Sequence, residues 1–502
     1  MCSQRLNSHH APLYEAMVAH HKMNPISLHV PGHKSGQGLL EEGERFLKTV
    51  MSIDYTEITG LDDLHHAEGV IKEAEELAAE CFGAEETHFL IGGSTVGNMA
   101  MISAVCGRDD VILVQRNVHK SVIHGLMLAG VRAVFIAPDI HPETGVATSV
   151  PLEIVQQALE QYPEAKALFV TNPNYYGMGV NLKPYAELLH AQGKMLLVDE
   201  AHGAHYGFHP EVPASALSQG ADAVVQSTHK MLTAMTMGAM LHVQGPLIDR
   251  AAVRQLLAML QSSSPSYPIM ASLDLARKRM HTEGKAWLEQ GIAVVNEFIR
   301  QLDKLQRFDY QPRGCQNHTN KGHNNTTDPF KIAISDKTYT LTGTELKDRL
   351  EDQGIFVEMT DGRQVLLVFT PATSRADMLR VIDVLHNICL EEPLEKKELQ
   401  RPISNILKLP YYAQISSPIA FDMRDISRAR EADAACSTVS VQEAVGYRSA
   451  DMVIPYPPGI PFLYPGEVIS ASIAEALRQL AASGIKFQGT QFGQTHKLKI
   501  YT

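Results

Sequence analysis

Ser227-Thr228-His229-Lys230 follows the short apolar run Ala223-Val224-Val225, so a buried strand is predicted to end just before it. A lysine at that place is costly to bury as a cation. Desolvation lowers the pKa of such an amine and so favours its neutral, nucleophilic form. The four residues therefore mark a candidate position for a reactive lysine at the edge of a sheet.

A carboxylate occupies the matching position on another predicted strand, because the apolar run Met195–Val198 ends on Asp199 and Glu200. A strand that ends in a carboxylate and another that ends in a lysine suit a cofactor with a basic nitrogen and an aldehyde. Pyridoxal phosphate has both groups and forms Schiff bases with lysine. Asp199 and Lys230 taken alone are equally compatible with two solvated side chains, so the rest of the chain has to discriminate.

Composition restricts the class of protein. A chain of 502 residues is long enough for roughly two to four domains. Its net charge of −12 argues against a basic face for nucleic acid. It holds no run of about 18 apolar residues, which a membrane span needs, and the polar stretch Met1–His10 lacks the apolar core of a signal peptide. We therefore expect a cytoplasmic protein that binds neither nucleic acid nor membranes.

Three further patterns do not support a site. The six cysteines contain no CxxC pair, which indicates buried, reduced thiols rather than disulfides or a zinc site. His202 and His205 do not have the HExxH spacing and lack a third ligand nearby in sequence, so no metal is expected. The run Asp199–His202 is similar to the acidic box of a helicase, but no GxxxxGK[ST] phosphate loop accompanies it.

Apolar runs and helical periodicities alternate between residues 70 and 230. The runs lack strict polar alternation, which indicates an α/β fold with a mostly parallel sheet covered on both faces. Ligands of such sheets bind at the carboxyl ends of the strands, where Asp199 and Lys230 fall. The predicted strands are His88–Ile91, Val111–Gln115, Val131–Ala137, Lys166–Thr171, Met195–Val198 and Ala223–Gln226. The predicted helices cover residues 70–82, a stretch from about Ser94, His119–Leu128, Leu152–Leu159 and Pro184–Ala191.

Changes of pattern predict four segments: an N-terminal arm (1–55), a large cofactor-binding domain (56–310), a small α+β domain (311–392) and a C-terminal α+β domain (393–502). The polar stretch Arg307–Thr327 and the charged stretch Glu391–Gln400 mark the later boundaries. The small domain is predicted as strand Lys331–Ile334, helix Gly343–Gln353, strands Ile355–Met359 and Gln364–Phe369, and helix Ala376–Ile388. The C-terminal domain is predicted to contain helices around Ile426–Ala432 and Val468–Ser483, with the rigid proline-rich loop Pro455–Pro461 between them.

Two more features lie on the predicted ligand side of the sheet. The turn Gly92–Asn98 joins a strand to a helix, and its backbone N–H groups with the hydroxyls of Ser94 and Thr95 suit a phosphate. Plain N-capping by Ser94 or Thr95 explains the same residues. His119 starts the next helix, where its imidazole is placed either to stack on a planar ring or to act as an ordinary cap.

The order phosphate turn, ring-stacking histidine, aspartate and lysine resembles the Orn/Lys/Arg decarboxylase family of fold-type I pyridoxal-phosphate enzymes, in its short bacterial form. The resemblance covers about residues 10 to 490, and several motifs in order make it specific. These motifs are His29–Lys34, Gly60–Leu64, Gly92–Asn98, Asn117–Ser121, Asp199–His205, Ser227–Lys230 and Pro455–Glu467. It implies a fold-type I transferase-like large domain.

The resemblance also implies site residues. Lys230 would hold pyridoxal 5′-phosphate covalently, Asp199 would keep the ring nitrogen protonated, and His119 would stack on the ring. These three would be the catalytic residues. The other cofactor contacts would come from Ser94, Thr95, Val96, Ser227 and His229 around the phosphate, Ala201 beneath the ring and His202 near its phenolic oxygen, with Ser262 or Ser263 reaching the phosphate of a neighbouring subunit. The implied assembly is a homodimer with shared active sites.

The implied activity is decarboxylation of a basic amino acid. L-Arginine to agmatine, in polyamine biosynthesis, is favoured because short forms of the family resemble biosynthetic arginine decarboxylases; lysine and ornithine stay open as substrates. Candidates for the substrate end of the site are Glu467, Glu358, Asp361 and His33, although the carboxylates also fit ordinary solvated positions. The receiver-like wing of the long forms is not expected, nor is their decamer.

Two other functions are considered. A different pyridoxal-phosphate reaction, such as transamination or aldol cleavage, would use the same residues and differ in its products. A non-enzymatic regulator with the same fold would be expected to lack Lys230 or Asp199, and both are present.

Overall fold

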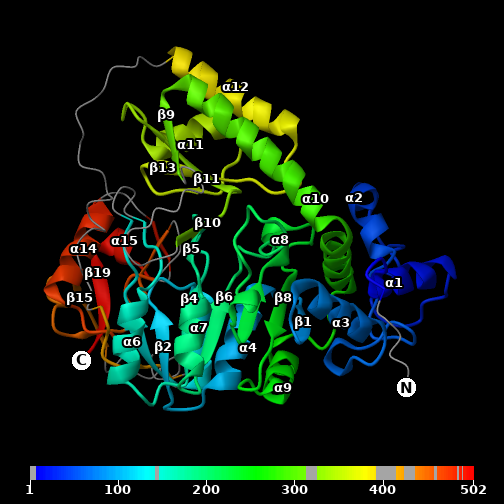
Figure 1. The fold of residues 1–502 in the computed structure, drawn as a ribbon, viewed down its shortest axis with the longest axis horizontal. Coiled ribbons are helices and arrows are strands. Elements are labelled where there is room, and N and C mark those ends of the chain that lie inside the picture. The colour runs from blue at the N-terminus through cyan, green and yellow to red at the C-terminus, as the bar shows by residue number, and fades with distance from the viewer. Residues whose placement is uncertain are drawn as a thin grey trace. The chain divides into compact units, whose positions relative to one another are not determined.

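The computed structural model describes residues 7–141, 146–311, 325–391, 414–422, 436–456, 461–482, 486–488 and 490–502. The chain divides into two compact units (Figure 1). The first comprises Met1–Val105 and Met195–Leu288, and the second comprises Cys106–Lys194 and Glu289–Thr502. The four-segment division drawn from the sequence stays a prediction.

The sheet of the first unit contains the two strands that the sequence analysis singled out. Its order is β1 (Glu86–Leu90), β8 (Ala239–Val243), β7 (Ala223–Gln226) and β6 (Met195–Asp199). β6 and β7 are parallel, with Asp199 opposite Val225, while β8 runs antiparallel to both of its neighbours. All four residues of β7 and all five of β8 are buried, as in a sheet covered on both faces. The carboxyl ends of β6 and β7 therefore lie together at one edge.

Helix α4 (Gly93–Val105) packs closely on this sheet because of one glycine. A Cβ atom on Gly97 would lie 2.5 Å from Val225 Cγ2 and 2.9 Å from Leu90 Cδ1. Only a residue without a side chain allows the helix to approach β7 and β1 this closely. The helix N-terminus is thereby held beside the strand ends.

The remaining helices of the first unit come from its N-terminal part and from the segment after β8. They are α1 (Pro12–Lys22), α2 (Glu41–Met51), α3 (Val70–Phe82), the single-turn α8 (Thr228–Met231), α9 (Arg250–Leu260) and the first part of α10 (Tyr267–Leu305). The buried Asp274 and Arg277 on α10 hold the chain near α1. Asp274 Oδ2 accepts a hydrogen bond from the Leu13 N–H at 3.1 Å, and Arg277 donates to His10 O at 2.6 Å.

The second unit carries a second group of sheet strands, in the order β4 (Ala167–Thr171), β2 (Val111–Gln115), β3 (Arg132–Ile136) and β14 (Ile419–Ala420). β2 is parallel to β3 and β4, and the short β14 runs antiparallel to β3. Its helices are α5 (Lys120–Ala129), α6 (Leu152–Gln161) and α7 (Lys183–His190), and β5 (Met178–Val180) pairs with β10 (Asn325–Thr327). These parallel strands and helices confirm the predicted α/β class.

A separate antiparallel sheet in the second unit has the order β12 (Met359–Thr360), β13 (Gln364–Val368), β11 (Lys331–Asp336) and β9 (Phe308–Gln311). Figure 1 shows α11 (Gly343–Glu351) and α12 (Arg375–Glu391) beside it. A capping box between Thr342 and Glu345 starts α11. The rest of α10 is tied to α12 by an ion pair between Glu297 and Arg375 at 2.6 Å.

The C-terminal part of the second unit forms a sheet of β15 (Cys436–Ser440), β19 (Lys497–Tyr501) and β16 (Arg448–Ser449). A second pair joins β17 (Ile454–Tyr456) and β18 (Lys486–Gln488). Helix α14 (Ala471–Ala482) contributes buried apolar side chains, among them Leu477 and Leu480, to a core that also contains Phe492 from α15 (Phe492–Thr495).

The differences from the predicted elements have local causes. The predicted strand Ile355–Met359 is wrong, because pairing with β13 begins only near Glu358 and leaves Phe356 exposed. β8 was not predicted, because His242 interrupts its apolar run. Lys230 lies in the short helix α8 rather than directly at the strand end. The predicted helix Ile426–Ala432, residues 457–460 of the proline-rich loop and most of the two predicted boundary segments lie outside the described residues.

Candidate active site

Lys230 lies in the first unit, one turn beyond the carboxyl end of β7. Its backbone N–H donates to Ser227 O at 3.0 Å, which closes the turn. Its Nζ lies 3.1 Å from Nε2 of the buried His202, which follows β6. The two predicted site residues therefore meet, although 27 residues separate them in sequence order. An imidazole next to the amine offers a neutral partner and an acceptor for one of its protons.

Asp199 ends β6 and is only 3% exposed. Its Oδ2 accepts a hydrogen bond from Asn98 Nδ2 at 2.8 Å, and its Oδ1 accepts one from the Ala201 N–H at 3.0 Å. In the described part of the chain, no positively charged side chain forms an ion pair with Asp199. A buried carboxylate with only neutral donors is suited to a cation from outside the chain, such as a protonated ring nitrogen.

The predicted phosphate turn lies at the N-terminus of α4. Ser227 Oγ donates to Ser94 Oγ at 2.8 Å, so the hydroxyls of two predicted ligands converge where the helix begins. A Cβ on Gly92 would lie 2.6 Å from Val96 Cγ2, so a glycine is needed for this tight turn. Backbone N–H groups of the first helical turn have no intrahelical acceptors. These features fit a phosphate group.

His229 is held against the same loop. Its ring Nδ1 and its backbone N–H both lie within hydrogen-bond distance of Gly238 O, at 3.0 and 3.1 Å. The carbonyl oxygen is an acceptor, so Nδ1 carries the proton in this arrangement. The orientation of the ring is thereby fixed next to Lys230.

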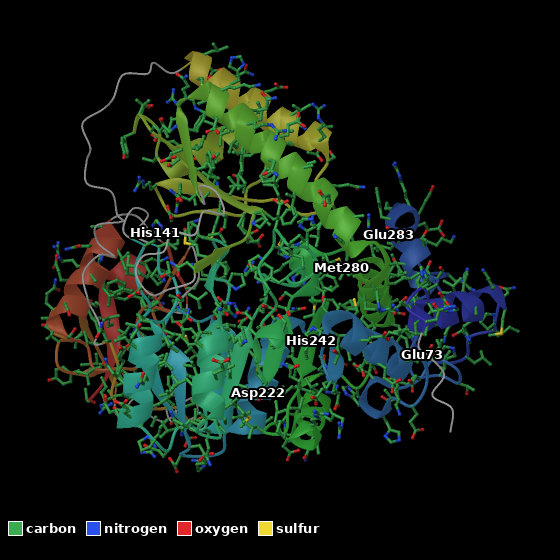
Figure 2. All side chains as sticks on the ribbon, viewed as in Figure 1. Glu73, His141, Asp222, His242, Met280 and Glu283 are labelled. Atoms are coloured by element: carbon green, nitrogen blue, oxygen red, sulfur yellow. The ribbon has the colours of Figure 1, made fainter. Side chains whose placement is uncertain are left out.

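A buried hydrogen-bond chain lies behind Asp199 and Ser227. Gln226 Nε2 donates to Glu200 Oε2 at 2.8 Å, Gln226 Oε1 lies 3.2 Å from His242 Nε2, and His242 Nδ1 lies 2.8 Å from Thr87 Oγ1. His242 is completely buried within the sheet (Figure 2). Burial lowers the pKa of His242 to about 3, so its ring is neutral and can donate through Nε2. The chain joins neighbouring strands just below the candidate site.

Glu200 shows how differently two adjacent carboxyls are placed. Complete burial raises the pKa of Glu200 to about 8, although hydrogen bonds from Gln226 and from the Ala216 N–H at 2.8 Å oppose that rise. Because successive side chains of a strand point to opposite faces, Asp199 faces Asn98 while Glu200 faces Gln226. Glu200 therefore belongs to the support of the site.

His119 lies in the second unit and caps the N-terminus of α5. Its Nδ1 accepts a hydrogen bond from the Ser121 N–H at 3.2 Å and lies 2.8 Å from Ser121 Oγ. An Nδ1 that accepts leaves the proton of a neutral ring on Nε2. The predicted capping role is therefore observed, and the ring has a defined orientation.

Two candidates for the distal end of a substrate are occupied by partners within the second unit. Both oxygens of Glu467 are bound by Arg116 Nη2, at 2.6 and 2.7 Å. Asp361 Oδ2 accepts from the Tyr176 hydroxyl at 2.7 Å, and Asp361 Oδ1 accepts from two backbone N–H groups. Both carboxylates are thus engaged in hydrogen bonds within the chain. Their positions in the sequence do not predict these partners.

The other two candidates differ from these. Glu358 is exposed, so its carboxylate faces solvent in the described structure. His33 lies in the first unit, where its Nε2 is 3.1 Å from Asp54 Oδ2 and its Nδ1 accepts from the Gly36 N–H at 3.1 Å. His33 therefore has a local structural role in the N-terminal arm.

Ser262 and Ser263 follow α9 and are exposed. The Ser262 carbonyl lies 2.9 Å from His65 Nε2, which fixes the backbone there. Near them in sequence, Gln261 accepts from the Ile91 N–H at 2.8 Å, just before the phosphate turn. The serine side chains are therefore available at the surface of the first unit.

Four residues of the site were missed by sequence reasoning. Asn98 and Gln226 hold Asp199 and Glu200, while Arg116 and Tyr464 surround Glu467. A detectable signal existed for Asn98, an amide within a mostly apolar helix, and for Arg116, a cation directly after a buried strand. Gln226 and Tyr464 carried no such signal.

The chain is similar to known proteins over nearly its whole length. The family model described as Orn/Lys/Arg decarboxylase, major domain, matches residues 11–377, and the model of that family's C-terminal domain matches residues 421–492. An uncharacterized protein, YaaO, of Bacillus subtilis is 40% identical, with 98% of each chain covered. An arginine decarboxylase of Bacillus anthracis is 36% identical, with 97% of this chain and 96% of the relative covered.

Solved structures agree in fold. The lysine decarboxylase LdcF of Francisella novicida superposes with a TM-score of 0.82 at 23% identity, covering 98% of this chain and 80% of that one. None of the described helices is long and apolar enough to cross a membrane.

Proposed function

The chain belongs to the Orn/Lys/Arg decarboxylase family, and from this premise we propose that it converts L-arginine to agmatine and CO₂. It is a pyridoxal-phosphate-dependent decarboxylase of a basic amino acid. Arginine is favoured over lysine and ornithine because the relative named arginine decarboxylase is 36% identical over nearly the whole chain. Three observations in the first unit carry the activity: Lys230 lies beside His202, the buried Asp199 has only neutral donors, and Ser227 is hydrogen-bonded to Ser94.

The first unit's residues fit pyridoxal 5′-phosphate. Bound there, the cofactor supplies an electron sink for the electron pair that remains when CO₂ leaves. Asp199 would hold the protonated ring nitrogen, and its two neutral donors would keep it oriented. Ser94, Thr95, Ser227 and His229 would bind the phosphate, with Val96 packed in the same turn.

Lys230 would bind the cofactor covalently through Nζ. His202, 3.1 Å from that nitrogen, would accept or return its proton and lie near the phenolic oxygen. Ala201 would pack beneath the ring and His119 would stack on its other face. These assignments combine the family resemblance with the contacts of each residue in its own unit.

The distal cation of the substrate would need an acidic partner. Glu467 and Asp361 are poor candidates, because each would have to give up internal hydrogen bonds. Glu358 is the remaining acidic candidate with an exposed carboxylate. A guanidinium would bind such a group through two parallel hydrogen bonds, whereas an ammonium would bind it as a point charge.

A homodimer and a cytoplasmic location are also part of this proposal. The arm and α2 expose large apolar side chains, including Leu28 at 92% and Phe46 at 74%, which would be costly without a partner. The exposed Ser262 and Ser263 would reach the phosphate bound by the neighbouring subunit. The cytoplasmic location rests on the sequence, whose six cysteines contain no CxxC pair.

The deciding experiment measures CO₂ release and amine products from arginine, lysine and ornithine side by side. We expect agmatine from arginine with the highest kcat/KM, and no turnover by Lys230→Ala. Lys183→Ala, which removes a highly exposed lysine, is the matched control and should retain full activity. A keto acid product would indicate transamination instead, and normal decarboxylation by Lys230→Ala would contradict the assignment of the nucleophile.

A further inference from the structure

Arg116 connects two parts of the second unit that lie far apart in sequence. It follows β2 directly and is only 5% exposed. Its Nη2 donates to both oxygens of Glu467, at 2.6 and 2.7 Å, and to Phe462 O at 3.4 Å. The guanidinium also lies 5.7 Å from the ring centre of Phe135 and 4.9 Å from that of Tyr464.

The backbone of Arg116 is held as firmly as its side chain. Its N–H donates to Ile136 O at 2.9 Å, and its carbonyl accepts a hydrogen bond from the Tyr464 hydroxyl. The Tyr464 ring stacks on Phe135, with ring centres 4.3 Å apart and planes inclined by 10°. The Tyr464 N–H also donates to Glu467 Oε2 at 3.2 Å, so one short segment contacts Arg116 at several atoms.

This contact bears on catalysis because Arg116 lies close to His119 along the chain. Only two residues separate them, and one of the two, Val118, is completely buried. Gln115 Nε2 donates to Asn117 Oδ1 at 2.7 Å, which adds a second restraint on the same segment. A displacement of Arg116 would therefore be transmitted along a short, packed segment to the imidazole of His119.

We propose that Arg116, Tyr464 and Glu467 form a clamp through which residues 462–467 position His119. The clamp rests on the proposed function, because His119 matters only if it contacts the cofactor. The three residues act as positioning residues. A buried ion pair contributes little net stability, since desolvation offsets its attraction, but its directional hydrogen bonds define one arrangement.

The test uses purified full-length variants. Tyr464→Phe removes the hydroxyl and keeps the stacked ring. Glu467→Gln keeps the shape and removes the charge opposite Arg116. The double variant Arg116→Met, Glu467→Met replaces the pair by apolar side chains, which often preserves stability. Arg108→Ala is the matched control, because it breaks an exposed ion pair of the same unit, that of Arg108 with Asp422 at 2.8 Å.

Three quantities are measured: hydrogen exchange of the amides of 116–121 without cofactor, the melting temperature, and steady-state kinetics with arginine. We expect Tyr464→Phe and Glu467→Gln to speed exchange of this segment by about tenfold or more. Misplacement by about 1 Å can lower kcat by about 100-fold, and KM should change far less. The double variant should recover the melting temperature but neither the slow exchange nor kcat, whereas Arg108→Ala should match the wild type.

The outcomes separate this proposal from the proposed function. Recovery of kcat together with stability in the double variant would overturn the clamp, since the pair would then be purely structural. Unchanged exchange of 116–121 in Tyr464→Phe and Glu467→Gln would overturn it as well. If the wild type decarboxylates none of the three amino acids, the proposed function fails, while the exchange data still report whether the segment is held.

Discussion

At the scale of single residues, the candidate site depends on the hydrogen-bond partners of two adjacent carboxyl groups. Asp199 and Glu200 are adjacent and both buried, yet they face different partners. Asp199 has neutral donors on both oxygens and suits an external cation. Glu200 instead ends a chain of hydrogen bonds that begins at Thr87 and passes through His242 and Gln226. We propose that the first carboxyl binds the cofactor, whereas the second belongs to the hydrogen bonds that join the strands.

The raised pKa of Glu200, about 8, predicts a pH dependence of stability. Between its ordinary pKa near 4.5 and about 8, the folded state keeps a proton that the unfolded chain has released. The stabilisation that protonated Glu200 contributes is therefore fully present below pH 4.5. It is lost as the pH rises to about 8, and this lowers the free energy of unfolding by up to a few kcal/mol. Glu200→Gln removes the ionisation.

The measurement compares melting temperatures from pH 5 to 8.5. We expect the melting temperature of Glu200→Gln to increase relative to that of the wild type as the pH rises across this range. Glu76→Gln, which changes an exposed glutamate, should follow the wild type throughout. A constant difference between Glu200→Gln and the wild type at every pH would disprove the assignment of the protonated state.

At the scale of secondary structure elements, α4 determines where the phosphate turn lies. The helix reaches the sheet through Gly97, and its first turn carries Ser94 beside Ser227. The short helix α8 positions the candidate nucleophile, because its single turn places Lys230 near His202. Each of these two helices is specified by the residues that directly follow a buried strand. Together they set the geometry of the candidate site.

Gly97→Ala should disturb this arrangement. The added Cβ would lie 2.5 Å from Val225 Cγ2, so helix and strand must separate, at a cost of about 1–3 kcal/mol. We expect a lower melting temperature and weaker pyridoxal-phosphate binding, measured by titration of the cofactor absorbance.

Gly107→Ala is the control for this experiment, because its Cβ would lie 3.8 Å from Asp110 Oδ2, an ordinary van der Waals contact. It should bind the cofactor as the wild type does. Wild-type stability and affinity in Gly97→Ala would show that α4 tolerates a larger separation from β7.

At the scale of the whole molecule, the described residues of the predicted N-terminal arm expose a large apolar surface. Leu28 and Phe46 are more than 70% exposed, and α2 contains no buried residue. Its charged residues and its apolar residues Phe46, Leu47 and Val50 alternate with helical periodicity, which is typical of a helix that covers a surface. We expect a second copy of the chain to bury it.

The double variant Leu28→Asp, Phe46→Asp should dissociate the proposed homodimer, because two buried charges would replace apolar contacts. Light scattering should report the mass of one chain instead of two. The rate of decarboxylation should also decrease, because Ser262 and Ser263 would no longer reach a neighbouring subunit. Phe356→Asp changes an equally exposed phenylalanine of the second unit and should leave mass and activity unchanged. A dimer that survives the double variant would refute the role of the arm.

The sequence by itself determined those elements that depend on local order, among them β6 and β7, but not β8. Burial of apolar runs predicts β6 and β7. Asp199 ends β6, and Lys230 lies one helical turn beyond the end of β7, in α8. The phosphate turn and the helix after it follow from glycine and hydroxyl residues at fixed spacing. These properties are short-range, so they can be read without knowing which strands become neighbours.

Tertiary structure alone decided which charged groups are satisfied within the chain. Glu467 and Asp361 are plausible substrate ligands from their sequence positions, yet Arg116 and Tyr176 occupy them. Arg116 precedes Glu467 by 351 residues, and no local pattern encodes such a pairing. Whether a carboxylate can bind a substrate depends on its partners after folding, because a buried charge must be neutralised wherever the fold brings an opposite charge within reach.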